Sequence, residues 1–173
     1  GFAGAPWTVA TYMINGKGSK DHKESKLFMF ENKITFEKLI DIITNATIEY
    51  LSRQIQAGAE VVKLFDSWAG SLNNQDFIDY CLEPSKKIAK ILKQRHPNVK
   101  FIAFPRSSGV NYLHFSKDSF FDCLAVDNNV PRIWIKENLQ KDICIQGNLD
   151  PFSLVYGGDY LKKECFDILN TLN

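Results

Sequence analysis

Five short apolar segments recur along the chain, and their order constrains the fold more than any other feature of the sequence. They are the opening run 1–7 and the runs 60–66, 99–104, 123–127 and 143–147. Short apolar runs bounded by turn-forming residues are typical of β-strands. The last three runs are almost continuously apolar, as in strands that are buried on both faces. This favours a parallel sheet over a one-sided antiparallel sheet.

Helical patterns fill the intervals between these runs. The longest pattern repeats apolar residues at three- and four-residue steps, with Thr35 as the expected N-cap and Gly58 as the expected stop. Pro84 is expected to interrupt the preceding helix, because proline lacks the backbone donor. Asp159 is the expected cap of the last helix. The expected helices cover 35–57, 74–82, 84–95, 107–121, 131–139 and 159–172.

The alternation of strands and helices predicts an α/β fold. Two architectures fit the pattern, an open doubly wound sheet and a (β/α)-barrel. A whole (β/α)8 TIM barrel takes about 250 residues, so five strands in 173 residues correspond to a partial barrel, with residues 1–173 as a single domain. The chain opens inside an apolar, glycine-rich run without a methionine, and we expect it to be a piece of a longer chain.

Charge and composition argue against several classes of protein. The net charge is +1, from 21 Lys and Arg against 20 Asp and Glu, which gives no electrostatic argument for a nucleic-acid partner. No apolar run approaches the roughly 20 residues that span a bilayer, and no secretory leader is recognisable. We therefore expect a cytoplasmic protein with no membrane partner. The four cysteines lack the close pairs of a zinc site, and we expect them to be small buried thiols.

In parallel α/β folds, the loops after the carboxyl ends of the strands build the functional site. Ser67 follows the second expected strand, where its hydroxyl could bind a substrate carboxylate; alternatively, the segment 66–68 only caps a helix. Arg106 follows the third, where its guanidinium could clamp a carboxylate or form an ion pair with Asp127 or another acidic residue at a strand end. The histidines form no triad and are expected to be solvated or to cap helices: His22, His96 and His114. These residues alone do not define a reaction.

Several blocks of sequence resemble the uroporphyrinogen decarboxylase family. The opening segment Gly-Phe-Ala-Gly-Ala-Pro-Trp-Thr, with Thr-Tyr-Met at 11–13, resembles the signature of that family. Further blocks agree in the family's order and span nearly all of the chain: 18–20, 56–59, 64–70, 104–106 and 146–151. The resemblance implies a (β/α)8-barrel enzyme of haem biosynthesis, usually a homodimer. It would decarboxylate the four acetate side chains of uroporphyrinogen, its tetrapyrrole substrate, to give coproporphyrinogen and carbon dioxide, with no cofactor and no metal.

The resemblance also implies roles for individual residues. Tyr12 matches a tyrosine that contacts substrate, and Ser67 matches a serine that hydrogen-bonds a substrate carboxylate. Phe2 and Phe65 match aromatic residues that line the cleft and pack on the flat macrocycle, with plain core packing as the alternative. Arg106 is a further cleft-lining candidate.

The family's catalytic groups match no position in this chain. Its catalytic aspartate and an arginine-bearing segment are expected before residue 1, and its functional histidine after residue 173. No catalytic residue and no metal ligand are therefore assigned, and we expect the chain alone to be inactive. One alternative is a unit that only folds or associates. Another is a corrinoid-dependent methyltransferase of the same superfamily, whose His-x-Cys zinc pair the sequence lacks.

Overall fold

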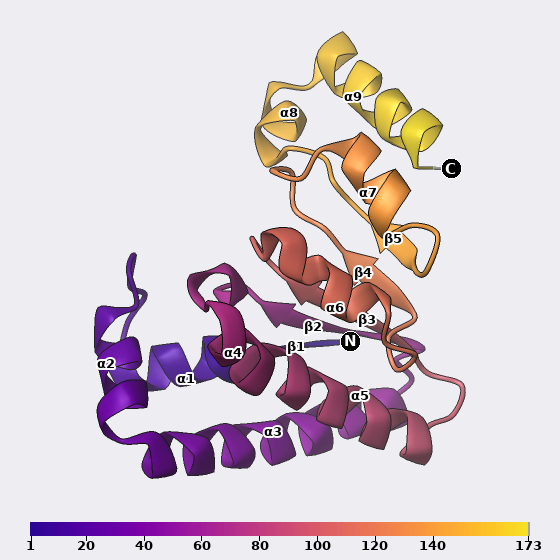
Figure 1. The fold of residues 1–173 in the computed structure, drawn as a ribbon. Coiled ribbons are helices and arrows are strands. Elements are labelled where there is room, and N and C mark those ends of the chain that lie inside the picture. Colours follow the sequence, from indigo (N-terminus) through magenta and orange to yellow (C-terminus); the bar gives the residue numbers. More distant parts are fainter. Residues whose placement is uncertain (173) are drawn as a thin grey trace.

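The centre of the molecule is a parallel sheet with strand order β1-β2-β3-β4-β5 (Figure 1). The structure is a computed structural model and describes residues 1–172. Because each strand pairs with its neighbour in sequence, the order never reverses, as it would in a doubly wound sheet. The expected partial barrel is thus confirmed. The strands are β1 Phe2–Gly4, β2 Val61–Asp66, β3 Lys100–Pro105, β4 Cys123–Ala125 and β5 Cys144–Gln146.

Helices connect the strands and cover one side of the sheet (Figure 1). The long helices α3 and α5 pack against each other below the sheet, and α7, α8 and α9 extend from its other end. The helices are α1 Pro6–Asn15, α2 Lys23–Glu31, α3 Lys33–Gln56, α4 Asn74–Phe77, α5 Glu83–Arg95, α6 Tyr112–Ser116, α7 Arg132–Asn138, α8 Pro151–Tyr156 and α9 Gly158–Thr171.

The two faces of the sheet have different environments. Val62, Leu64 and Phe101 point to the helical side and are buried in the main core, together with helix residues such as Trp7 and Phe36. Their neighbours along the strands point to the other side and are half-buried or exposed. We call that side the concave face and define it by Phe2, Lys63, Phe65, Ile102, Phe104, Cys123, Cys144 and Gln146.

A side-chain hydrogen bond across this face shows how strongly the sheet bends. Lys63 Nζ on β2 donates to Gln146 Oε1 on β5 at 2.6 Å, although β3 and β4 lie between the two strands. In a flat sheet, strands three positions apart would be about 14 Å apart, too far for this contact. The sheet therefore curves toward the concave face, as the wall of a barrel does.

The region around Pro84 differs from the prediction. The chain winds on from α4 through a π-helical turn, Ile78–Leu82, directly into α5, without a break. Pro84 lies in the first turn of α5, where a backbone donor is not needed. The wider turn ahead of it absorbs the change in hydrogen bonding, so proline marks a new α-helix without interrupting the winding.

Helix starts also depart from the expected caps. Asn32 precedes α3, so Thr35 lies inside the helix, and no side chain of the described residues 1–172 caps this end. Gly157 precedes α9, and Asp159 lies in the first turn, where it pairs with Lys162 at 3.2 Å. Helices α1 and α2 were not predicted, since α1 follows β1 after a single residue and α2 is short and polar.

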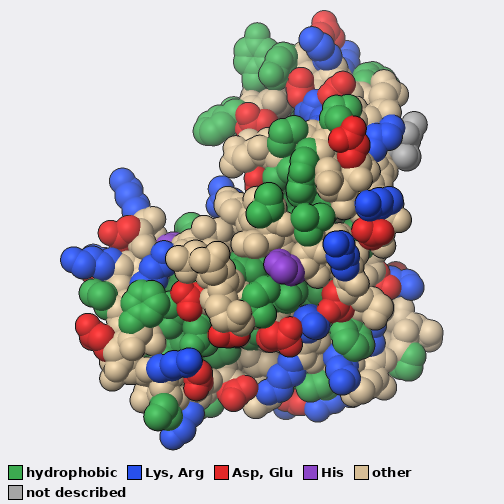
Figure 2. All heavy atoms as spheres, in the orientation of Figure 1, with side chains coloured by type: hydrophobic (Ala, Val, Ile, Leu, Met, Phe, Trp, Pro, Cys, Tyr) green, Lys and Arg blue, Asp and Glu red, His purple; other side chains and the backbone are tan. Residues whose placement is uncertain are grey.

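The outer surface is mixed in character. Figure 2 shows basic and acidic side chains interspersed over α3 and α5, in keeping with the near-zero net charge. Apolar side chains gather at the tip formed by α8 and the start of α9, where Phe152, Val155 and Tyr156 are exposed. No helix within residues 1–172 has the length and apolar character needed to cross a membrane.

The cysteines are free thiols in unlike environments. Cys81 is buried, as expected. Cys144 is exposed on the concave face, so the expectation of a buried thiol is wrong there. Cys123 is half-buried and is the register partner of Cys144 on the neighbouring strand. The apolar run around Cys144 is a strand with only one covered face.

We predict that Gly70→Ala destabilises the chain. Gly70 lies in the turn after β2, and a Cβ there would be 2.3 Å from the backbone oxygen of Ser107. Forcing that overlap should lower the free energy of unfolding by about 2 kcal/mol, measured by urea denaturation. Gly18→Ala is the matched control, because the nearest atom to its Cβ would be 3.9 Å away. Equal urea midpoints for the two variants would contradict the prediction.

Candidate functional site

The loops that follow β2 and β3 lie side by side at one end of the sheet. Asp66 and Pro105 are register partners, so Ser67 and Arg106 follow them at neighbouring positions. Backbone hydrogen bonds join the two loops, from Arg106 N to Asp66 O at 3.0 Å and from Gly70 N to Arg106 O at 3.0 Å. The predicted hydroxyl and guanidinium are therefore on one rim.

Helix α1 brings Tyr12 toward the same loop. The Tyr12 ring lies 6.3 Å from the ring of Trp68, which directly follows Ser67. Tyr12 is 45% exposed and Ser67 is half-buried. Neither hydroxyl forms a hydrogen bond within residues 1–172, so both are free to bind a ligand.

A buried hydrogen-bond network fixes α1 to the β2 loop. Thr8 Oγ1 on α1 donates to Asp66 Oδ1 at 2.6 Å and accepts from the backbone N–H of Trp68 at 3.2 Å. One hydroxyl thus holds together the helix that carries Tyr12 and the loop that carries Ser67. The segment 66–68 leads directly into a short 3-10 helix, Ala69–Ser71, with Trp68 at its N-cap position and no capping bond from a side chain within residues 1–172.

Asp66 is an unusual carboxyl group. It is only 2% exposed, and the buried thiol of Cys81 interacts with it in addition to the hydroxyl of Thr8. Burial raises its pKa to about 6, and the hydrogen bond from Thr8 only partly opposes this. The protonated form is therefore favoured more strongly in the folded chain than in water.

A second buried carboxylate organises the loops after β3 and β4. Asp127 Oδ2 accepts from Ser107 N at 2.7 Å and from Tyr112 Oη at 2.7 Å, and its Oδ1 accepts from Asn129 N at 3.0 Å. Burial and this carboxylate raise the pKa of Tyr112. Arg106 is exposed and forms no ion pair within residues 1–172, so the expected pair with Asp127 does not form. Its guanidinium remains available to a ligand.

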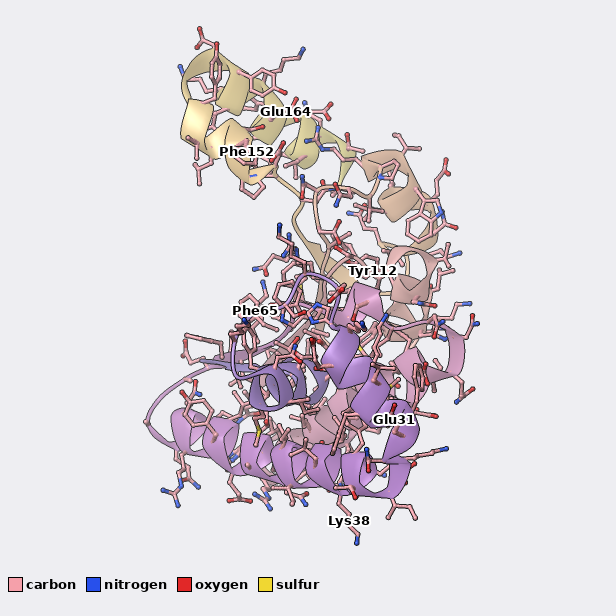
Figure 3. The ribbon with its side chains drawn as sticks, turned by 90° about the vertical axis from the view of Figure 1, so that its left-hand side faces the viewer. Glu31, Lys38, Phe65, Tyr112, Phe152 and Glu164 are labelled. Atoms are coloured by element: carbon pink, nitrogen blue, oxygen red, sulfur yellow. The ribbon has the colours of Figure 1, made fainter. Side chains whose placement is uncertain are left out.

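Aromatic rings form a row on the concave face. Phe65 packs edge-to-face against Phe2 on one side, with centroids 6.0 Å apart, and against Phe104 on the other, at 5.9 Å. Phe2 is 65% exposed, and none of the three belongs to the buried core. In Figure 3, Phe65 lies between the lower helices and the arm that carries Phe152 and Glu164. The row offers apolar ring surface to a flat ligand.

Sequence reasoning missed two features near this row. His22 was expected to be solvated or to cap a helix; it stands at the N-cap position of α2, yet it is only 3% exposed and its ring lies 4.8 Å from that of Trp68. The surrounding polar loop gave no sign of this tertiary contact. Lys63 was not singled out, although a lone charge inside an apolar strand is a readable signal that one face of the strand stays polar. Within residues 1–172, no group of three or more His, Cys, Asp or Glu side chains could hold a metal ion.

Comparison with known protein families gives a match over the whole chain. The family model of uroporphyrinogen decarboxylase matches residues 1–173. The uroporphyrinogen decarboxylase of Paracoccus denitrificans is 55% identical over 164 residues, which are 95% of this chain and 48% of that protein. That of a Jannaschia species is 55% identical over 172 residues, covering 99% of this chain and 50% of that protein. The chain therefore spans about half the length of these relatives.

A solved structure resembles the fold. A methyltransferase from Methanosarcina mazei superposes with a TM-score of 0.78 over 98% of this chain and 49% of its own. At 22% sequence identity, this likeness supports the arrangement of strands and helices and carries no functional assignment.

Asp66 should make stability depend on pH. Its pKa is about 6 in the folded chain and about 4 when unfolded, so the folded state binds the proton more tightly. The free energy of unfolding should therefore fall by about 2 kcal/mol between pH 4 and pH 7 through this group. Asp66→Asn should remove that component in urea titrations at each pH, whereas Asp142→Asn, at an exposed site, should not. Parallel pH profiles for wild type and Asp66→Asn would refute the assignment.

Proposed function

The chain belongs to the uroporphyrinogen decarboxylase family, and we propose that it supplies a large part of the substrate site of an enzyme that decarboxylates uroporphyrinogen. The observation that carries the proposal is the match of the whole chain to this family at 55% identity. The concave face and its rim support it, because they combine ring surface, free hydroxyl groups and an unpaired guanidinium. A macrocycle of four pyrrole rings with carboxylate side chains needs those three features.

In the proposed complex, the macrocycle lies against the aromatic row, with Phe2 and Phe65 in contact with its plane. Burial of ring against ring contributes most of the binding free energy, since each aromatic side chain removes a large apolar area from water. The carboxylates reach the rim, where Ser67 and Tyr12 donate hydroxyl hydrogen bonds and Arg106 provides a bidentate contact. The buried Thr8–Asp66 pair keeps these groups in one geometry without contacting the substrate.

The reaction can proceed without a cofactor. Protonation of a pyrrole ring carbon beside an acetate side chain makes the ring a cationic electron sink. The carboxylate then leaves as carbon dioxide, and the electron pair of the broken carbon–carbon bond enters the ring to give an exocyclic methylene group. A proton added to that methylene carbon makes the methyl group, and release of the proton first added to the ring carbon restores the pyrrole, so that one proton is consumed for each carbon dioxide. The protein then needs only to position the substrate and to stabilise the positive charge on the ring. We assign no residue of this chain to the proton transfers and place those groups in parts of the family pattern outside residues 1–173.

We further propose that the whole protein is a cytoplasmic homodimer that binds neither nucleic acid nor membrane. The family resemblance implies the dimer, and the near-zero net charge supports the absence of an anionic partner.

Product analysis tests the proposed reaction. The full-length protein that contains this chain and the chain alone are each incubated anaerobically with uroporphyrinogen, and the oxidised porphyrins are separated by carboxyl count. We expect coproporphyrin from the full-length protein and only uroporphyrin from the chain alone, because the family's aspartate and histidine are missing from it. Coproporphyrin from the chain alone would overturn our placement of the catalytic groups, and none from either sample would overturn the reaction.

Substitutions at the rim test the site. In the full-length protein, Tyr12→Phe and Ser67→Ala should each lower kcat/KM by about tenfold or more, since each removes a hydrogen bond to a charged carboxylate. Tyr50→Phe and Ser119→Ala are matched controls, because these exposed residues lie on α3 and before β4, away from the rim. Wild-type kinetics for both rim variants would remove the two residues from the site.

A further inference from the structure

Lys63 places a positive charge in the middle of the concave face. It lies on β2 two residues before Phe65. Its side chain leans toward the carboxyl ends of the strands, because its Nζ lies over the ring of Phe65. Lys63 Nζ is 4.7 Å from the ring centroid of Phe65 and 4.9 Å from that of Phe104. The ammonium is therefore level with the aromatic row on which the macrocycle is proposed to lie.

This ammonium has no anionic partner within residues 1–172. Its hydrogen-bond acceptor is the neutral amide oxygen of Gln146, and it takes part in no ion pair there. The ionisable group that acts on it is the thiol of Cys123, whose pKa burial and the adjacent Cys144 raise to about 12, so that thiol is neutral near pH 7. Burial lowers the pKa of Lys63 itself, as expected for a half-buried cation without a counter-charge.

A half-buried cation of this kind is stabilised when an anion binds beside it. Removing an ammonium from water is costly unless a carboxylate or similar group pairs with it. The aromatic rings beside Lys63 Nζ supply only a weak cation–π attraction. The amide of Gln146 orients the ammonium and leaves its remaining donors free, since an ammonium carries three.

We propose that Lys63 binds a substrate carboxylate that is retained through the reaction, an inference that rests on the proposed function and adds a specificity-determining residue to it. With the macrocycle against Phe65, a carboxylate side chain directed into the concave face would meet Lys63 Nζ. The bound carboxylate is not the reacting one. An ammonium paired with a departing carboxylate would stabilise the ground state more than the transition state, in which that charge is being lost.

Kinetics of the full-length protein test the inference. Lys63→Gln should raise KM about tenfold and leave kcat within about twofold, because a retained carboxylate is bound equally in the ground and transition states. Binding of coproporphyrin, followed by fluorescence, should weaken by a similar factor and lose much of its dependence on salt. Lys63→Arg should restore KM and the salt dependence. Lys100→Gln, at the start of β3 and paired with Asp122 at 3.6 Å, is the control and should match wild type.

Chemical modification of the wild-type protein provides a test that needs no variant. Saturating coproporphyrin should protect Lys63, but not Lys100, from an amine-acylating reagent, as read by mass spectrometry. Unchanged KM and salt dependence in Lys63→Gln, or modification of Lys63 at the same rate with ligand bound, would show that Lys63 only ties β2 to β5 and would overturn the inference. Failure of the wild-type protein to decarboxylate uroporphyrinogen is a different result and overturns the proposed function.

Discussion

The packing of helices against only one face of a curved parallel sheet is the constraint on which the other features depend. Apolar strand residues such as Leu64 and Phe101 meet the helices, and this side contains the large buried core. Strand alternation then directs Lys63 and Phe65 to the opposite face, where no helix of residues 1–172 covers them. Curvature gathers side chains from β2 and β5 over that face, as the Lys63–Gln146 contact shows. Because the core lies on one side of the sheet, side chains from several strands remain available on the concave face.

Two buried carboxylates fix the positions of the loops at the rim of the concave face. Asp66 links α1 to the loop after β2 through Thr8, and Asp127 links the loops after β3 and β4 through Ser107 and Tyr112. Their roles differ in electrostatic terms. Asp127 accepts three hydrogen bonds, whereas burial raises the pKa of Asp66. The hydroxyl of Ser67 and the guanidinium of Arg106 thus follow strand ends whose loops are joined to buried carboxylates.

Strands were readable from the sequence because each is a short apolar run, and their parallel pairing followed from the near-continuous hydrophobicity of the later ones. The ends of the helices could not be predicted, because α3 and α9 begin without a side-chain cap and the chain winds through Pro84 by way of a π-helical turn. The candidate residues Ser67 and Arg106 could be placed on one rim because strand ends converge in any parallel sheet. Neither the burial of His22 against Trp68 nor the contact between Lys63 and Gln146 could be predicted, because each joins segments far apart in sequence.

The most direct test of the central claim, that the concave face holds the substrate, is a crystal structure of the full-length protein with coproporphyrinogen bound. We expect the macrocycle to lie on the concave face, with its plane against the rings of Phe2 and Phe65 and one carboxylate within hydrogen-bond distance of Lys63 Nζ. A macrocycle bound on the helical side of the sheet, or at the exposed apolar tip of α8, would contradict the claim.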